Sequence, residues 1–138
     1  AKVPIQKEMD LIQNFIDLEM LRYGERLDLN FEQDIQDTSA EISPLVLLSI
    51  VENAFKHGVS GAIERPKIEI DMAVKDKQLD FRVFNTKAIS SQSDQQNYKG
   101  GIGAKNIQRQ LELTYPGQYS WQVDERAESY EVQLSITL

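Results

Sequence analysis

The segment PLVLLSIVENAFKHG, residues 44–58, combines a helix pattern with an unusual group of polar side chains. Its apolar residues recur at helical spacing, which predicts an amphipathic helix that begins at Ser43-Pro44 and ends near Gly58. The second half of this helix carries an acid, an amide, an amine and the single imidazole of the chain, at Glu52, Asn53, Lys56 and His57.

The polar end of this helix has two interpretations. Helical spacing places Asn53, Lys56 and His57 on neighbouring turns of one side. An amide oxygen is a hard ligand that suits Mg²⁺, and Lys and His can meet phosphate oxygens. The alternative is an ordinary amphipathic helix whose polar edge holds these residue types, with His57 favoured by the helix dipole.

The flanking sequence predicts the rest of the fold. Helical spacing predicts two further helices, and alternation of apolar residues predicts five strands. Strands outnumber helices and occur in hairpins, so we expect an α+β two-layer sandwich in which about three helices cover one face of a mixed sheet. Residues 1–138 then form one domain. The expected helices are 4–23, 44–58 and 104–115, and the expected strands are 26–35, 67–74, 79–84, 119–123 and 130–138.

Composition excludes several classes of function. The net charge of −7 argues against a nucleic-acid partner, which would need a basic face. Because the chain has no cysteine and one histidine, disulfides, thiol catalysis and zinc sites with several histidines are excluded. No apolar run reaches the roughly 18 residues of a membrane-spanning helix, so we expect no membrane contact by this domain.

Two further segments are candidates for binding. YKGGIGAKNIQRQ (98–110) places three glycines where phosphate could approach backbone N–H groups at a helix start. Its alternative is a flexible hinge followed by a solvated helix face, and its spacing fits neither a Walker loop nor a Rossmann turn. The strand before it ends at Asn85, which opens a polar loop (85–101) of a length that is often functional. Asn85 is otherwise an ordinary turn residue.

Taken in this order, these segments resemble the ATP-binding catalytic domain of sensor histidine kinases, and most of all the LytS/YehU type. That type carries a Val-Glu-Asn-Ala…Lys-His-Gly segment, which matches residues 51–58 here, and a Gly-x-Gly-Leu-x-Asn segment, which matches residues 101–106 except that Ala104 stands where Leu is usual. The resemblance extends to KEMDLIQNFIDLEMLRYGERLDL (7–29) and so covers nearly the whole chain. It implies the Bergerat (GHKL) fold, in which ATP lies between the helical layer and a lid.

The resemblance also implies roles for matching residues. Asn53 matches the residue that binds Mg²⁺ and phosphate, and Glu52 lies beside it as a catalytic candidate that positions metal or water. Lys56 and His57 match the basic pair near the phosphates. Asn85 stands near the position of an Asp that accepts a hydrogen bond from the adenine amino group.

The remaining implied features surround the lid. Residues 86–103 correspond to the ATP lid. Residues 1–24 correspond to a leading helix that connects to a dimerisation and phosphoacceptor region, and we expect that region to have been cut away. The further nucleotide-binding residues are Gly101, Ile102, Gly103, Asn106 and Arg109.

The implied function is that of the catalytic domain of a two-component sensor histidine kinase. Such a domain supplies the γ-phosphate of ATP to a histidine on a separate domain, for relay to a response regulator. We expect ATP and Mg²⁺ as ligands and the phosphoacceptor helices of the parent kinase as the direct partner. The expected location is cytoplasmic, within a bacterial parent protein that is anchored in the membrane.

Two alternatives stay open. One is a degenerate kinase-like module that binds partners without ATP turnover. It is suggested by VFNTKA (83–88), where the family has an Asp followed by glycines, although the Asn85 oxygen can still accept a hydrogen bond. The other is a Bergerat-fold ATPase or Ser/Thr kinase. It is disfavoured because Ser49 stands where ATP-hydrolysing relatives carry an acid, one helical turn before Asn53.

Overall fold

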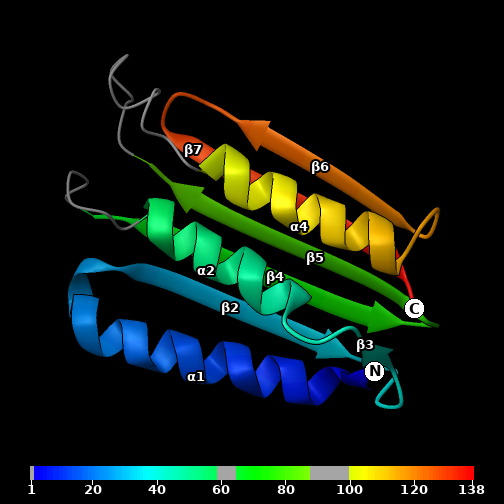
Figure 1. Ribbon diagram of the computed structural model, residues 1–138. Helices are drawn as coiled ribbons and strands as arrows, with labels where there is room; N and C mark the ends of the chain where they lie inside the picture. Colours follow the sequence, from blue (N-terminus) through cyan, green and yellow to red (C-terminus); the bar gives the residue numbers. More distant parts are fainter. Residues whose placement is uncertain (1, 59–64, 88–99) are drawn as a thin grey trace.

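The helices and one main sheet account for most of the described chain. The computed structural model describes residues 2–58, 65–87 and 100–138, with the backbone alone at 57–58 and 100–102. Figure 1 shows the helices running side by side across one sheet. The helices are α1 (Ile5–Tyr23), α2 (Val46–Gly58) and α4 (Gly100–Thr114), and a short 3-10 helix, η1 (Gly24–Arg26), follows α1.

The main sheet has five strands in the order β2-β4-β5-β7-β6. β2 and β4 are parallel, and the long connection that this requires contains α2. The other neighbouring strands are antiparallel. The β4–β5 hairpin turns at Asp76 and Lys77, whose φ angles of 51° and 66° suit a two-residue turn. The strands are β2 (Asp28–Ile35), β4 (Lys67–Lys75), β5 (Gln78–Thr86), β6 (Tyr119–Glu125) and β7 (Ser129–Thr137).

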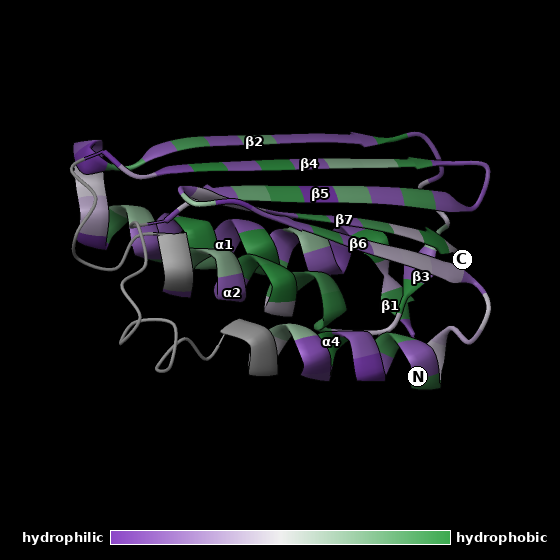
Figure 2. Cartoon of the chain, turned by 90° about the horizontal axis from the view of Figure 1, so that it is seen from above, coloured by the Kyte–Doolittle hydropathy of each residue, from purple (hydrophilic) through white to green (hydrophobic). Residues whose placement is uncertain are grey.

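All three helices cover the same face of the sheet, as Figure 2 shows. The strand pattern explains this, since alternate residues of β4 are buried apolar side chains and the residues between them are charged, apart from Ala73. The core therefore lies between the sheet and the helical layer. The predicted α+β two-layer sandwich with a mixed sheet is confirmed.

Three details differ from the prediction or lie outside what the structure describes. Residues 36–43, for which no helix or strand is predicted, contain a short strand, β3 (Glu41–Ile42), which pairs with β1 (Val3–Pro4). α4 begins at Gly100 rather than at residue 104. Of the predicted lid (86–103), residues 88–99 lie outside the described part of the chain. None of the described helices is long and apolar enough to cross a membrane.

Candidate functional site

A groove of about 520 Å³ lies among the three helices. α2 forms its middle, because α2 packs against both α1 and α4. The groove is at the end of the molecule where α1 and α2 finish and α4 begins (Figure 1). The predicted site residues that line it are Glu52, Asn53, Lys56, Gly103 and Asn106.

The two predicted binding segments approach each other at Asn53 and Gly103. An ideal Cβ built on Gly103 would lie 2.9 Å from Asn53 Oδ1 and 3.7 Å from Asn53 Cγ. Real Cβ atoms essentially never approach an oxygen this closely, so a side chain at position 103 would displace the amide. The missing side chain therefore lets the start of α4 meet the polar side of α2, and the two segments line the same groove.

α1 fixes the start of α2 through a buried carboxylate. Glu8 is fully buried, and its two oxygens accept hydrogen bonds from the backbone N–H groups of Leu45 (2.9 Å) and Leu48 (3.0 Å). These N–H groups lie at the first turn of α2, where they lack partners within the helix and where the dipole favours an anion. Leu45 itself has a φ of 70°. Glu8 thus holds the helix that carries Asn53.

Two further contacts position the helices around the groove. The rings of Phe15 in α1 and Phe55 in α2 meet edge to face, with centroids 5.2 Å apart. Next to the C-terminal end of α4, the backbone N–H of Ser43 donates to the hydroxyl oxygen of the buried Tyr115 at 2.8 Å. Burial raises the pKa of Tyr115 despite this hydrogen bond. Apolar packing and one buried polar contact thus set the helix spacing.

Asn85 lies below the helices, at the end of β5. It is 1% exposed, and its side chain points to the helical face, like those of the buried Phe81 and Val83. Its Nδ2 donates to the Thr86 carbonyl at 3.0 Å, and no described group donates to its Oδ1. Asn85 does not line the groove. A buried acceptor without a described partner costs free energy, which makes this oxygen a candidate acceptor for a ligand's N–H group.

The other predicted site residues are not among the described residues that line the groove. Arg109 is exposed on α4 and does not line the groove. His57 is in the last turn of α2, and Gly101 and Ile102 are in the first turn of α4. The structure describes only the backbone of these three residues.

The third group of lining residues, from α1, was missed by sequence reasoning. α1 contributes one wall of the groove, through Phe15, Glu19, Arg22 and Tyr23. Their spacing along the helix places them on one face, and this was the available signal. Sequence periodicity shows that such a face exists, but it does not show which other helices that face meets.

The groove carries opposite charges that are not paired with one another. Its charged lining residues are Glu19, Arg22, Glu52 and Lys56. None of the four makes an ion pair or a side-chain hydrogen bond with the described residues. Carboxylates and amides can hold a hard cation, and the two bases can meet phosphate. The groove thus offers ligands for both halves of a metal–phosphate complex.

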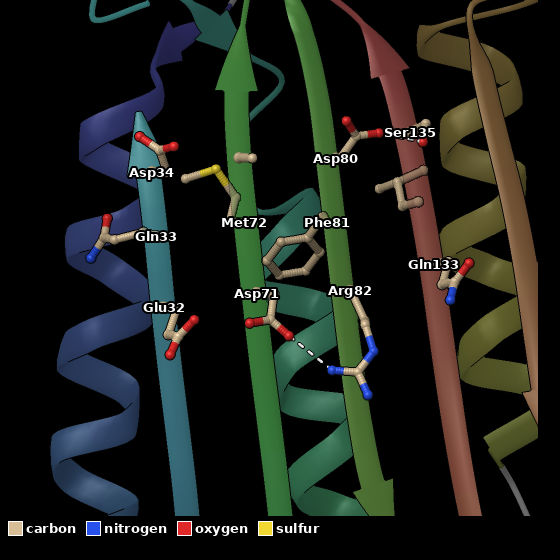
Figure 3. Close-up of a pocket in the computed structure, with 12 residues that line it drawn as sticks. Glu32, Gln33, Asp34, Asp71, Met72, Asp80, Phe81, Arg82, Gln133 and Ser135 are labelled. Carbon is tan, nitrogen blue, oxygen red and sulfur yellow. Dashed lines mark hydrogen bonds and ion pairs between the residues drawn. The ribbon is translucent and has the colours of Figure 1, made fainter. Parts of the chain in front are cut away.

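A second hollow, of about 410 Å³, lies on the opposite, open face of the sheet (Figure 3). Arg82 lines it and bonds to Asp71 (2.8 Å), to Glu69 (3.1 Å) and to Glu131. Burial alone would raise the pKa of Glu69, but hydrogen bonds from Lys67 and Arg82 outweigh it and lower that pKa. The hollow contains none of the predicted site residues, and its main cation is already satisfied.

Solved structures with this fold are similar over almost the whole chain. The nucleotide-free catalytic domain of histidine kinase ThkA matches with a TM-score of 0.66 and 13% identity, over 99% of this chain and 95% of that one. Full-length ShkA in complex with AMPPNP matches with a TM-score of 0.65 and 14% identity, over 99% of this chain and 31% of ShkA. The chain has the fold of a histidine kinase catalytic domain.

Sequence relatives of this chain are sensor kinases. The sensor protein LytS of Staphylococcus epidermidis is 28% identical over 81 residues, 59% of this chain and 14% of LytS. The sensor histidine kinase YpdA of Escherichia coli is 24% identical over 120 residues, 83% of this chain and 21% of YpdA. No protein-family model matches the chain. The matches confirm the predicted resemblance, and the domain spans less than a quarter of these relatives.

Proposed function

We propose that this chain is the ATP-binding catalytic domain of a two-component sensor histidine kinase. The observation that carries the proposal is the contact between Asn53 and Gly103, which unites the two predicted binding segments at one groove. The similarity to sensor kinases in sequence and to kinase catalytic domains in fold supports the same activity.

The groove residues fit a magnesium–triphosphate complex. Among the described residues no three His, Cys, Asp or Glu side chains cluster as a metal cage. This agrees with Mg²⁺ sites that use one or two protein ligands together with substrate phosphates. Asn53, with Glu52 beside it, would hold the ion, which neutralises charge on the phosphates when bound. Lys56 would bind phosphate oxygens, and His57, Gly101, Ile102, Asn106 and Arg109 are further candidates for nucleotide contacts.

Asn85 would read the base. Its buried Oδ1 has no described donor, so it can accept from the adenine amino group as a carboxylate would. This weakens the reason for treating the chain as a degenerate module, because the acceptor remains although the charge is gone. Residues 86–103 would cover the bound nucleotide.

In the proposed reaction a histidine nitrogen of another domain attacks the γ-phosphorus of ATP. A P–N bond forms, the bond from the γ-phosphorus to the β,γ-bridging oxygen breaks, and ADP leaves. Catalysis of this kind depends on positioning and on electrostatic stabilisation. This domain would align the triphosphate and exclude water. The acid that activates water in related ATPases is absent, because the corresponding position is Ser49, so we expect slow hydrolysis.

The proposed partners are the phosphoacceptor helices of the parent kinase and, through them, a response regulator. ThkA, whose catalytic domain shares this fold, has been solved in complex with the response regulator TrrA. The parent protein would be anchored in a bacterial membrane with this domain on the cytoplasmic side.

Calorimetric titration with a non-hydrolysable ATP analogue tests the proposal. We expect micromolar to sub-millimolar affinity that increases when Mg²⁺ is added. Phosphorylation of a separately supplied fragment that carries the acceptor histidine would then distinguish an active kinase from a partner-binding module. Absence of binding at millimolar analogue would contradict the proposed function.

A further inference from the structure

α1 supplies a cation to the groove that the implied site does not contain. Among the lining residues the positive charges are Lys56 on α2 and Arg22 near the end of α1. The chain as a whole has a net charge of −7, so a triphosphate needs local positive charge to bind. Lys56 is already assigned to phosphate by its segment, and Arg22 is the second positive charge on the same cavity.

The environment of Arg22 differs from that of an arginine with a structural role. Arg82, on the open face of the sheet, bonds to three carboxylates. Arg22 makes no ion pair or hydrogen bond with the described residues, even though Glu19 lines the same groove one helical turn earlier. Its guanidinium therefore keeps all of its N–H donors available.

The neighbouring Tyr23 holds the Arg22 guanidinium in place. The guanidinium carbon lies 5.4 Å from the centre of the Tyr23 ring, within the range of a cation–π contact. The Tyr23 ring is partly buried and packs against the core. The contact with a packed ring reduces the conformational freedom of the unpaired guanidinium at the wall of the cavity.

We propose that Arg22 binds phosphate oxygens of the nucleotide from the α1 wall, opposite the contacts made by α4. This inference rests on the proposed function. The planar guanidinium can donate two parallel hydrogen bonds to one phosphate or bridge two, which an ammonium group cannot do in the same geometry. The triphosphate is then held by three helices, and its binding depends on how α1 sits against α2.

The test compares Arg22→Ala with the matched control Arg26→Ala. Arg26 is an exposed arginine four positions further along that does not line the groove. Binding of a non-hydrolysable ATP analogue, ADP and adenosine is measured for each variant at the same salt and Mg²⁺ concentrations. We expect Arg22→Ala to bind the analogue and ADP about tenfold more weakly, with adenosine unchanged. Arg26→Ala should match the wild type.

Two further variants separate a contact with phosphate from a structural role. Arg22→Lys keeps the charge but loses the planar fork, so its affinity should fall between those of the wild type and Arg22→Ala. Thermal unfolding should be the same for all Arg22 variants, because the residue is exposed. If Arg22→Ala binds the analogue within twofold of the wild type while Lys56→Ala does not, Arg22 has no phosphate role although the proposed function stands. A wild-type chain that binds no analogue overturns both.

Discussion

The amide oxygen of Asn53 occupies the space in which a side chain at position 103 would begin, 2.9 Å from an ideal Cβ on Gly103. We expect Gly103→Ala to weaken binding of an ATP analogue by about tenfold, because the amide must rotate away. The fold should tolerate the change, since alanine favours a helix over glycine by about 1 kcal/mol. Titration and thermal unfolding check both parts. The control is Gln108→Ala, because Gln108 is exposed on the same helix and lies outside the groove. If both variants bind the ATP analogue with the same affinity, the role of the close approach between Asn53 and Gly103 is contradicted.

The buried Glu8 carboxylate provides a test of how α2 is positioned. Glu8→Gln keeps the size of the side chain but replaces one acceptor by a buried NH₂ group that faces an N–H donor. We expect the free energy of unfolding to fall by about 2–3 kcal/mol, the cost of an unsatisfied buried polar pair. Urea unfolding measures it. Glu25→Gln, on the exposed surface after α1, should change stability by less than about 0.5 kcal/mol. Similar stability of the two variants would rule out the cap.

Substitutions of Asn85 can test the adenine contact separately from any effect on the stability of the fold. Asn85→Leu removes the acceptor but suits a buried site whose cross-strand neighbours include Ile68 and Tyr130. We expect affinity for the ATP analogue to fall about tenfold or more, with discrimination against the matching GTP analogue lost. Asn85→Asp keeps an acceptor oxygen and should retain that discrimination, at some cost in stability from the buried charge. If Asn85→Leu still prefers the ATP analogue, Asn85 does not read the base.

The ion pairs of Arg82 should make the free energy of unfolding depend on pH. The hydrogen bonds that lower the pKa of Glu69 below its unfolded value contribute stability above that value, and this contribution is lost as the pH falls through the folded pKa. We expect Arg82→Gln to cost about 1 kcal/mol at pH 7, since these pairs are partly exposed. The difference from the wild type should shrink in acid. Urea unfolding of the wild type and the variant, at pH 7 and in acid, measures this difference. Arg126→Gln, which loses one exposed pair with Asp124, is the control, and an equal cost at both pH values would contradict the role of Glu69.

Much of the fold could be predicted from periodicity. The segments that form α1, α2 and the hairpin strands bury one face each, and the spacing of their apolar residues shows which face that is. β1 and β3 could not be found this way, because two residues carry no period. The start of α4 was placed late, because its glycines suggested a hinge although they belong to the helix.

The site was only partly predictable, for a different reason. The segments around Asn53 and Gly103 each had an ordinary alternative and indicated a binding site only when taken together, and their contact follows from the packing of α2 on α4. The α1 wall of the groove could not be predicted, because the apolar periodicity of a helix does not show which other helices it packs against. The depth of Asn85 beneath the helices also depends on packing, since its place at a strand end is equally typical of an exposed turn.

The measurement that tests the central claim most directly is calorimetric titration of the wild type and Asn53→Ala with a non-hydrolysable ATP analogue, each with and without Mg²⁺. If Asn53 holds the ion against the phosphates, Mg²⁺ should strengthen binding to the wild type, and Asn53→Ala should lose most of that gain, about tenfold or more. The same Mg²⁺ dependence in both proteins would contradict the claim that this groove binds a magnesium–nucleotide complex through Asn53.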